Sequence, residues 1–129
     1  MSDFVFSKQK VKPKRITKEI QSIYEEDKPH VQEFHGNWGS LGVSRNLYNG
    51  FNPFENDEHI VVVIGGPVLM FQDNSFLNNE NNSNDGTVAI FQRWIEGEMK
   101  WDEDLSGPFV IMIINKIISE IICITDLMS

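Results

Sequence analysis

The sequence lacks a membrane-spanning run, a pair of cysteines and a secretory signal. Its single cysteine, Cys123, excludes an internal disulfide. No apolar run approaches the roughly 20 residues that span a bilayer, and the start of the chain lacks the apolar core of a secretory signal. We therefore expect a cytoplasmic protein. Because Cys123 lies within an apolar run and free cysteine is commonly buried, we expect its thiol to lie in the core.

Motifs for metal, phosphate or calcium binding are also missing. His30, His35 and His59 are separated by loops and lack metal-ligand spacing. The acidic turn at 102–104 lacks the spacing of a calcium loop, and no glycine-rich loop could cradle a phosphate. We predict neither a metal site nor a cofactor, and we place the three histidines on the surface or in hairpins.

Apolar and aromatic residues, in contrast, are plentiful enough for a core. The chain has 129 residues, the size of one domain. It is 40% hydrophobic and contains nine Phe and three Trp, a composition that argues against disorder. We expect residues 1–129 to form a single domain.

The charge is unevenly distributed along the chain. The net charge is −8, yet residues 1–18 carry six of the eleven basic side chains against one acid. Residues 19–129 form a strongly anionic body, which repels nucleic acid and anionic membranes and favours a cationic partner. We interpret the basic cluster as a solvated face that pairs with the chain's own acids. Its members are Lys8, Lys10, Lys12, Lys14, Arg15 and Lys18.

Hydrophobic periodicity predicts an α+β fold of mainly antiparallel sheets with flanking helices. The run Ile60–Ile64 is continuously β-branched, as in a strand buried on both faces. Thr17 is a plausible N-cap for the first helix, and residues 51–58 and 72–86 read as loops. The other expected elements are a strand at 3–8, helices at 18–24 and 87–95, a hairpin at 31–43, and closing strands at 109–114 and 120–125.

Several segments, taken in order, resemble the N-terminal glutamine-hydrolysing domain of asparagine synthetases and related class II amidotransferases. That family opens with a strand whose freed N-terminal cysteine is the nucleophile. It then has a helix, an arginine-bearing strand, an Asn-Gly pair after a buried strand, and a closing hairpin. The matching segments here are Met1–Phe4, Thr17–Tyr24, Gly42–Leu47, Gly65–Gly66, Asn84–Thr87, Leu105–Phe109 and Ile124–Asp126.

The resemblance implies an incomplete αββα sandwich of the N-terminal-nucleophile hydrolases, covering the front portion of the family domain. It places Ser2 at the nucleophile, Arg45 at the substrate carboxylate and Asp85 at the substrate amine. Gly65 stands where the family has the asparagine of the oxyanion site, and Gly66 keeps a backbone N–H there. From the residues alone, Ser2 is equally an ordinary N-terminus, Arg45 a solvated hairpin residue and Asp85 a turn or helix-cap residue.

On this reading the chain is a degenerate relative without efficient glutaminase activity. Glycine at position 65 removes a side-chain donor, a loss that typically costs about 100- to 1000-fold in rate. A serine at position 2 is also far less acidic than a thiol. The expected ligand is a glutamine-like small molecule.

A function of a different class is also open. A small acidic domain suits an immunity or inhibitor protein that neutralises a basic partner such as a nuclease toxin. The acids at 55–58 and 96–104 would then form the docking surface; alternatively, they serve only solubility. Because the strand at 120–125 would be a sheet edge, we also expect that it could pair with a second copy as a homodimer.

Overall fold

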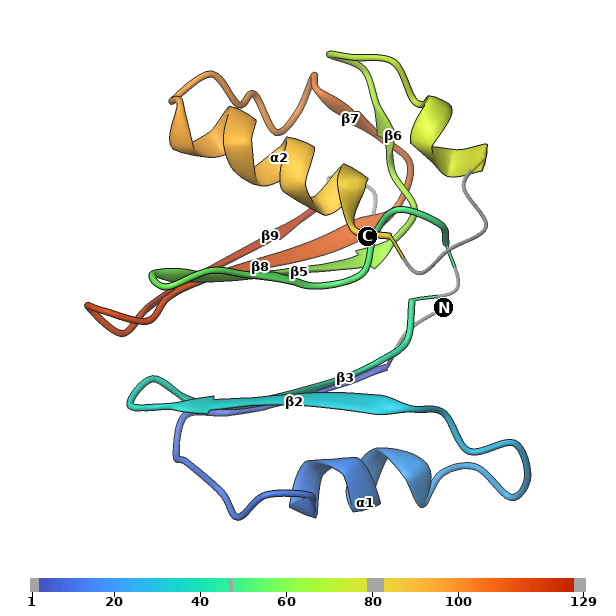
Figure 1. Cartoon of the computed structure of the whole chain (residues 1–129), viewed down its shortest axis with the longest axis vertical. Coiled ribbons are helices and arrows are strands. Elements are labelled where there is room, and N and C mark those ends of the chain that lie inside the picture. Colours follow the sequence, from blue (N-terminus) through green and yellow to red (C-terminus); the bar gives the residue numbers. More distant parts are fainter. Residues whose placement is uncertain (1–2, 47, 79–82, 127–129) are drawn as a thin grey trace.

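The protein is built of four layers, in the order helix, sheet, sheet, helix (Figure 1). The computed structural model describes residues 3–46, 48–78 and 83–126. Within these residues the expected class, α+β with antiparallel sheets and two α-helices, is confirmed. No helix in these ranges has the length and apolarity needed to cross a membrane.

The first sheet has three antiparallel strands in the order β1-β3-β2. They are β1 (Phe4–Ser7), β2 (Val31–Gly36) and β3 (Gly39–Ser44). The β2–β3 hairpin closes at Gly36 and Gly39. Helix α1 (Arg15–Gln21) covers the outer face, where Ile16 and Ile20 pack on Val31.

The second sheet has four antiparallel strands in the order β4-β5-β8-β9. The strands are β4 (Phe54–Glu55), β5 (His59–Gly65), β8 (Phe109–Asn115) and β9 (Glu120–Thr125). Helix α2 (Asp85–Ile95) covers the outer face. Beside it lie the 3₁₀ turn η1 (Ser75–Asn78) and a small sheet of β6 (Val68–Leu69) and β7 (Leu105–Ser106).

The two large sheets are joined by an apolar core. Alternate residues point to opposite faces of a strand, so β5 and β8, covered on both sides, read as continuous apolar runs. Leu41 of β3, Ile60 of β5 and Ile114 of β8 all belong to this core, and each side chain is almost completely buried. The remaining members of this core are Phe34, Trp38, Val43, Val62, Ile64 and Met112.

The first helix does not start where its sequence predicts. We expected residues 18–24 with Thr17 as the cap, but α1 spans Arg15–Gln21 and its capping residue, Lys14, makes no side-chain cap. The acceptor comes instead from Glu33 in β2, which binds the N–H groups of Lys14 and Thr17 at 2.9 and 3.0 Å. A cap that arrives from another element leaves no local sequence signal.

The predictions for Cys123, for His59 and for two loops were wrong in whole or in part. Cys123 is exposed, because β9 is an outer strand. His59 is buried, because its ring packs between Phe91 and Trp94 of α2. The loop expected at 51–58 contains β4. The loop expected at 72–86 contains η1 and the first two residues of α2, which begins at Asp85 and not at Thr87, while residues 79–82 lie outside the described residues.

Candidate functional site

The start of β1 is fastened to the end of β3, beside Arg45. The Asp3 N–H donates to the Ser44 hydroxyl at 2.7 Å, and the Ser44 N–H donates to the Asp3 carbonyl at 2.8 Å. The Tyr24 hydroxyl also donates to the Asp3 carboxylate. Ser2, to which the resemblance gives the nucleophile's role, lies outside the described residues. The described chain therefore begins next to the predicted carboxylate-binding arginine.

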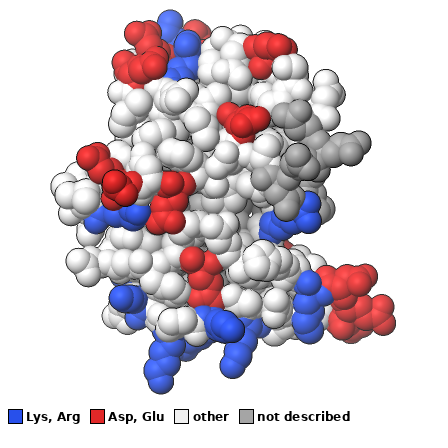
Figure 2. Space-filling model, viewed as in Figure 1, with Lys and Arg blue, Asp and Glu red and all other residues white. Residues whose placement is uncertain are grey.

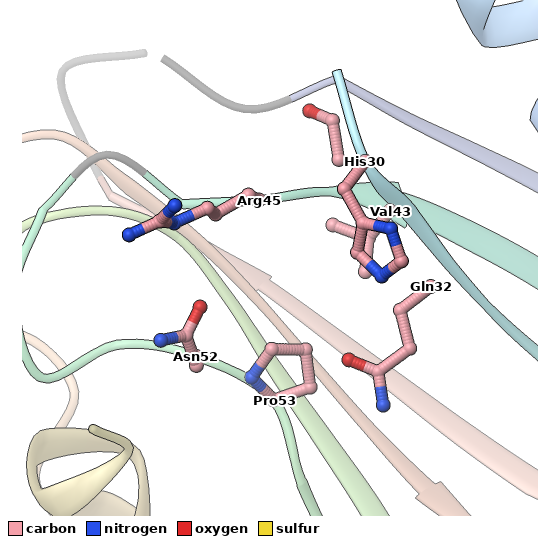
Figure 3. Close-up of a pocket in the computed structure, with 7 residues that line it drawn as sticks. His30, Gln32, Val43, Arg45, Asn52 and Pro53 are labelled. Atoms are coloured by element: carbon pink, nitrogen blue, oxygen red, sulfur yellow. The ribbon is translucent and has the colours of Figure 1, made fainter. Parts of the chain in front are cut away.

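Arg45 lines a small cavity at this end of the molecule. The cavity has a volume of about 230 Å³. Figure 3 shows Arg45 and Asn52 on one side of the space and His30 and Gln32 on the other. The Arg45 N–H donates to the His30 carbonyl at 3.1 Å, which extends the β2–β3 ladder by one pair. The other lining residues are Val43, Ser44 and Pro53.

Asp85 is the first residue of α2 and does not line that cavity. It is exposed and lies in the first helical turn, where a carboxylate is favoured by the helix dipole. The helix start is fixed to the loop at 50–53, because the Gly50 carbonyl accepts the N–H groups of Gly86 at 2.8 Å and Thr87 at 3.2 Å. The same loop carries Asn52 to the Arg45 cavity, which Asp85 itself does not line.

Gly65 and Gly66 line a different cavity, of about 210 Å³, together with Tyr48 and Asp126. Gly65 ends β5 with a φ of +99°, a conformation that favours glycine. A Cβ on Gly66 would lie 2.4 Å from a ring carbon of Tyr48. Both glycines therefore have a steric reason to be glycine, independent of any lost oxyanion donor.

Asn46 follows Arg45 in the chain and bonds to Gly65 and Tyr48, which line the second cavity; this role was not predicted. Its side chain is buried, and Nδ2 donates to the carbonyls of Val63 and Gly65, both at 2.9 Å. Its Oδ1 accepts the Tyr48 N–H at 2.9 Å. Since β4 pairs with β5 only at Ile60 and Val61, Asn46 takes the place of a neighbouring strand further along β5. It thus holds the Gly65 turn beside Arg45.

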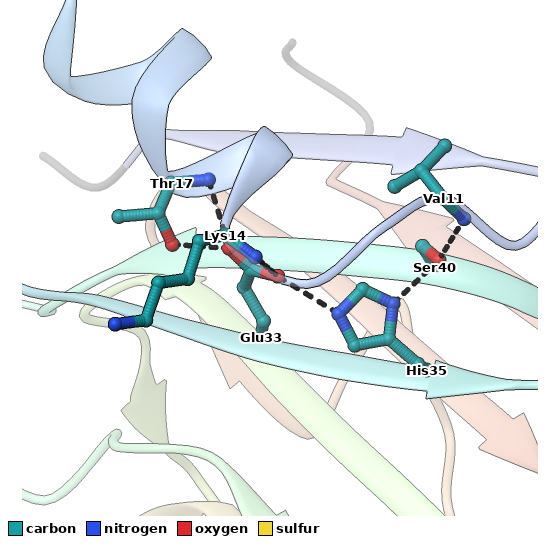
Figure 4. Close-up of polar contacts among 6 residues, drawn as sticks. All are labelled: Val11, Lys14, Thr17, Glu33, His35 and Ser40. Carbon is teal, nitrogen blue, oxygen red and sulfur yellow. Dashed lines mark hydrogen bonds and ion pairs between the residues drawn. The ribbon is translucent and has the colours of Figure 1, made fainter.

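A second polar cluster joins α1 to the first sheet (Figure 4). His35 contacts Ser40 through Nδ1 at 2.7 Å and Glu33 through Nε2 at 2.8 Å. The residue types resemble a Ser-His-acid triad, but Ser40 is fully buried and its hydroxyl accepts the Val11 N–H at 2.9 Å. Its hydroxyl therefore cannot reach a substrate, and the cluster instead anchors residues 11–17.

Glu33 should make the anchoring of α1 sensitive to acid. Burial alone would raise its pKa, but hydrogen bonds from Thr17, Lys14 and His35 outweigh burial and lower the pKa from 4.5 to about 2. A lowered pKa adds stability that is complete above the ordinary pKa and is lost as pH falls from about 4.5 to about 2. The Glu33 side chain is 11% exposed, so the contribution is about 3 kcal/mol.

We therefore expect Glu33→Gln to remove this pH dependence. Urea unfolding measured between pH 2 and 6 should show the wild type losing about 3 kcal/mol more than the variant. Glu26→Gln, at an exposed position after α1, is the matched control. Parallel pH curves for the wild type and Glu33→Gln would show that the Glu33 contacts contribute no pH-dependent stability.

Some of the charged side chains that we expected on the surface form ion pairs within the chain, and others do not. Asp104, expected in an acidic docking turn, is buried and accepts from Arg93 Nε at 2.7 Å and from the Lys100 N–H at 2.8 Å. Lys116 pairs with Glu55 at 2.9 Å. In the basic cluster, all of which is described, only Arg15 forms an ion pair, with Glu19 at 3.6 Å. Our interpretation that this cluster pairs with the chain's own acids is therefore wrong for its lysines.

Comparison of the chain with protein-family models, with curated proteins and with solved structures found no match. Among the described residues, no group of three or more His, Cys, Asp or Glu side chains could hold a metal ion.

Proposed function

We propose that this chain is a glutamine-amidotransferase-like domain of the asparagine synthetase type, which binds a glutamine-like amino acid beside Arg45 and hydrolyses its amide inefficiently. The observation that carries the proposal is the pairing of Asp3 with Ser44 at one end of two stacked sheets. In an αββα sandwich of N-terminal-nucleophile hydrolases, the chain start must lie near the substrate-binding arginine. The order of layers in Figure 1 supports the same proposal.

The ligand chemistry follows from the side chains around the cavity. The planar guanidinium of Arg45 can bind a carboxylate through two parallel hydrogen bonds. Gln32, Asn52 and His30 add hydrogen-bond donors and acceptors on the opposite and adjacent walls. The volume of about 230 Å³ lies below the roughly 300–1,000 Å³ of typical small-molecule sites. The cavity therefore favours a ligand of amino-acid size that carries a carboxylate.

Weak catalysis follows from the residues near Gly66. With glycine at position 65, the only donor left at the proposed oxyanion position is a backbone N–H, and the Tyr48 ring packs directly on Gly66. Loss of one oxyanion donor costs about 100- to 1000-fold in rate. We expect a protein that retains the ligand and has lost most of the turnover.

The test is to measure glutamine binding and ammonia release separately. Glutamine titrated into ¹⁵N-labelled protein should shift the Arg45, Gln32 and Asn52 signals, and Arg45→Ala should weaken binding about tenfold or more because it removes a charge-assisted bond. Arg15→Ala, an exposed arginine outside the cavity, is the matched control. Ammonia release should stay near background and be unchanged in Ser2→Ala.

Two results would separate the parts of this proposal. Rapid ammonia release that Ser2→Ala abolishes would show an efficient enzyme and refute only the loss of catalysis. Absence of glutamine binding at millimolar concentrations, with a correctly folded protein, would refute the amidotransferase-like site itself.

The anionic surface near the end of α2 favours one second candidate. Glu96, Glu98, Asp102 and Glu103 are all exposed there, and such a surface suits a small acidic inhibitor of a basic protein. A basic protein that co-purifies at low salt and dissociates as salt is raised would support it. Pairing of two copies through β9, the outer strand of the second sheet, stays a prediction.

A further inference from the structure

The strand β2 has an open backbone edge. It is one of the two outer strands of the first sheet and pairs only with β3. In an antiparallel pair, the residues alternate between those bonded to the partner strand and those that face away from it. The Arg45 N–H bonds to the His30 carbonyl, so the backbone groups of Val31, Glu33 and His35 must face the open side. These groups therefore lie outside the β2–β3 ladder.

A groove runs along this edge. It has a volume of about 550 Å³, and its floor contains Val31, Glu33 and His35. Helix α1 forms the opposite wall with Lys14, Thr17, Lys18 and Gln21. The groove therefore has the two walls of a β-addition site, a free strand edge and a helix placed beside it.

The charge of the groove is set by lysines. Lys14 and Lys18 are exposed, and no described acid lies within ion-pair distance of either. The Glu33 carboxylate already accepts hydrogen bonds from the backbone N–H groups of Lys14 and Thr17 and contacts His35. The Lys14 side chain extends away from this carboxylate (Figure 4). Figure 2 shows Lys and Arg side chains gathered over the α1 layer. A negatively charged occupant complements this wall.

The floor is also held rigid before any partner arrives. His35 has both ring nitrogens engaged, by Ser40 and by Glu33, and Glu33 in turn binds the start of α1. A strand edge fixed in this way loses little conformational freedom when a peptide is added.

We propose that the groove between β2 and α1 binds an extended acidic segment of a partner protein, which adds to the first sheet as a fourth strand alongside β2. The backbone groups of Val31, Glu33 and His35 supply the hydrogen bonds, and Lys14 and Lys18 select acidic side chains. The groove shares one lining residue, His30, with the Arg45 cavity, and the proposal stands whether or not a glutamine-like ligand binds in that cavity.

The experiment uses a fluorescent peptide of alternating glutamate and valine, titrated into the full chain at low ionic strength. A second peptide of the same sequence carries N-methyl groups on alternate amides, which keeps its charge but removes the ladder bonds. We expect the first peptide to bind, with the amide signals of Val31, Glu33 and His35 shifted. The N-methyl peptide should bind at least about tenfold more weakly, since each hydrogen bond contributes measurably.

Charge variants test the selectivity of the groove. Lys18→Glu should weaken binding of the acidic peptide by about fivefold, because an attraction becomes a repulsion. Lys10→Glu makes the same charge change at an exposed position outside the groove and should have little effect. Equal binding of the plain and N-methyl peptides, equal effects of the two variants, or shifts confined to other strands would each overturn the proposal. So would peptide-independent dimerisation through β2.

Discussion

Replacement of Asn46 by leucine is expected to lower the free energy of unfolding by about 3 to 5 kcal/mol. The side chain is buried and satisfies two carbonyls of β5 and the N–H of Tyr48. Leucine has a similar size but no polar atoms, so these backbone groups would remain buried without partners. Each unsatisfied group costs about 1 to 3 kcal/mol, and burying the leucine offsets only part of that sum.

Urea unfolding monitored by tryptophan fluorescence gives the measurement. Asn49→Leu is the matched control, because Asn49 is exposed and bonds to the Leu77 carbonyl at 3.1 Å; its effect should stay within about 1 kcal/mol. Asn46→Leu should also weaken glutamine binding if the Arg45 cavity depends on the adjacent turn. Similar stabilities for the wild type and Asn46→Leu would contradict the role given to Asn46.

The second large effect is expected for Gly39→Ala, at about 3 to 4 kcal/mol. Gly39 begins β3 with a φ of +132°, and a Cβ there would lie 2.1 Å from the Ser7 carbonyl oxygen. That φ is strained for any other residue and costs about 1 to 3 kcal/mol. The clash adds to the strain, because its partner is backbone and can yield only if β1 moves away from β3.

Gly97→Ala separates the two contributions. Gly97 also has a positive φ, +79°, but no atom lies within 4 Å of a Cβ placed on it. Its substitution should cost about 1 kcal/mol, from backbone strain alone. Thermal or urea unfolding of both variants measures the difference. Equal losses for the two alanines would mean that β1 yields at no cost and that the close approach to Ser7 is unimportant.

Much of the fold could be predicted because it depends on local periodicity. The continuous apolar run of β5 and the helical spacing within residues 87–95 are visible in the sequence, although the expected apolar face of Val88, Phe91, Trp94 and Ile95 includes Ile95, which is exposed, and omits Ile90, which is buried. Two-residue strands such as β4 have no periodicity to detect. The burial of a strand residue depends on whether its strand is central or outer, so Cys123 could not be placed by its apolar neighbours.

The candidate site, too, could be predicted only in part. The family resemblance predicted Arg45 as a site residue, and the structure places it directly after Ser44, which bonds to Asp3, in a cavity that Asn52 also lines. The role of Asn46 could not be predicted, because it depends on how far β4 extends along β5. The roles of Asp104 and Glu33 could not be predicted for a related reason. Asp104 binds Arg93, and Glu33 binds the start of α1, and in both cases the tertiary fold brings the partners together.

The cap that Glu33 supplies to α1 has a consequence for the order of assembly. A helix of seven residues is far below the roughly 12 to 15 residues at which isolated helices become marginally stable in water. Its capping acceptor exists only once the β2–β3 hairpin has formed. We therefore expect α1, with the basic side chains of Arg15 and Lys18, to become stable only after the β2–β3 hairpin has formed.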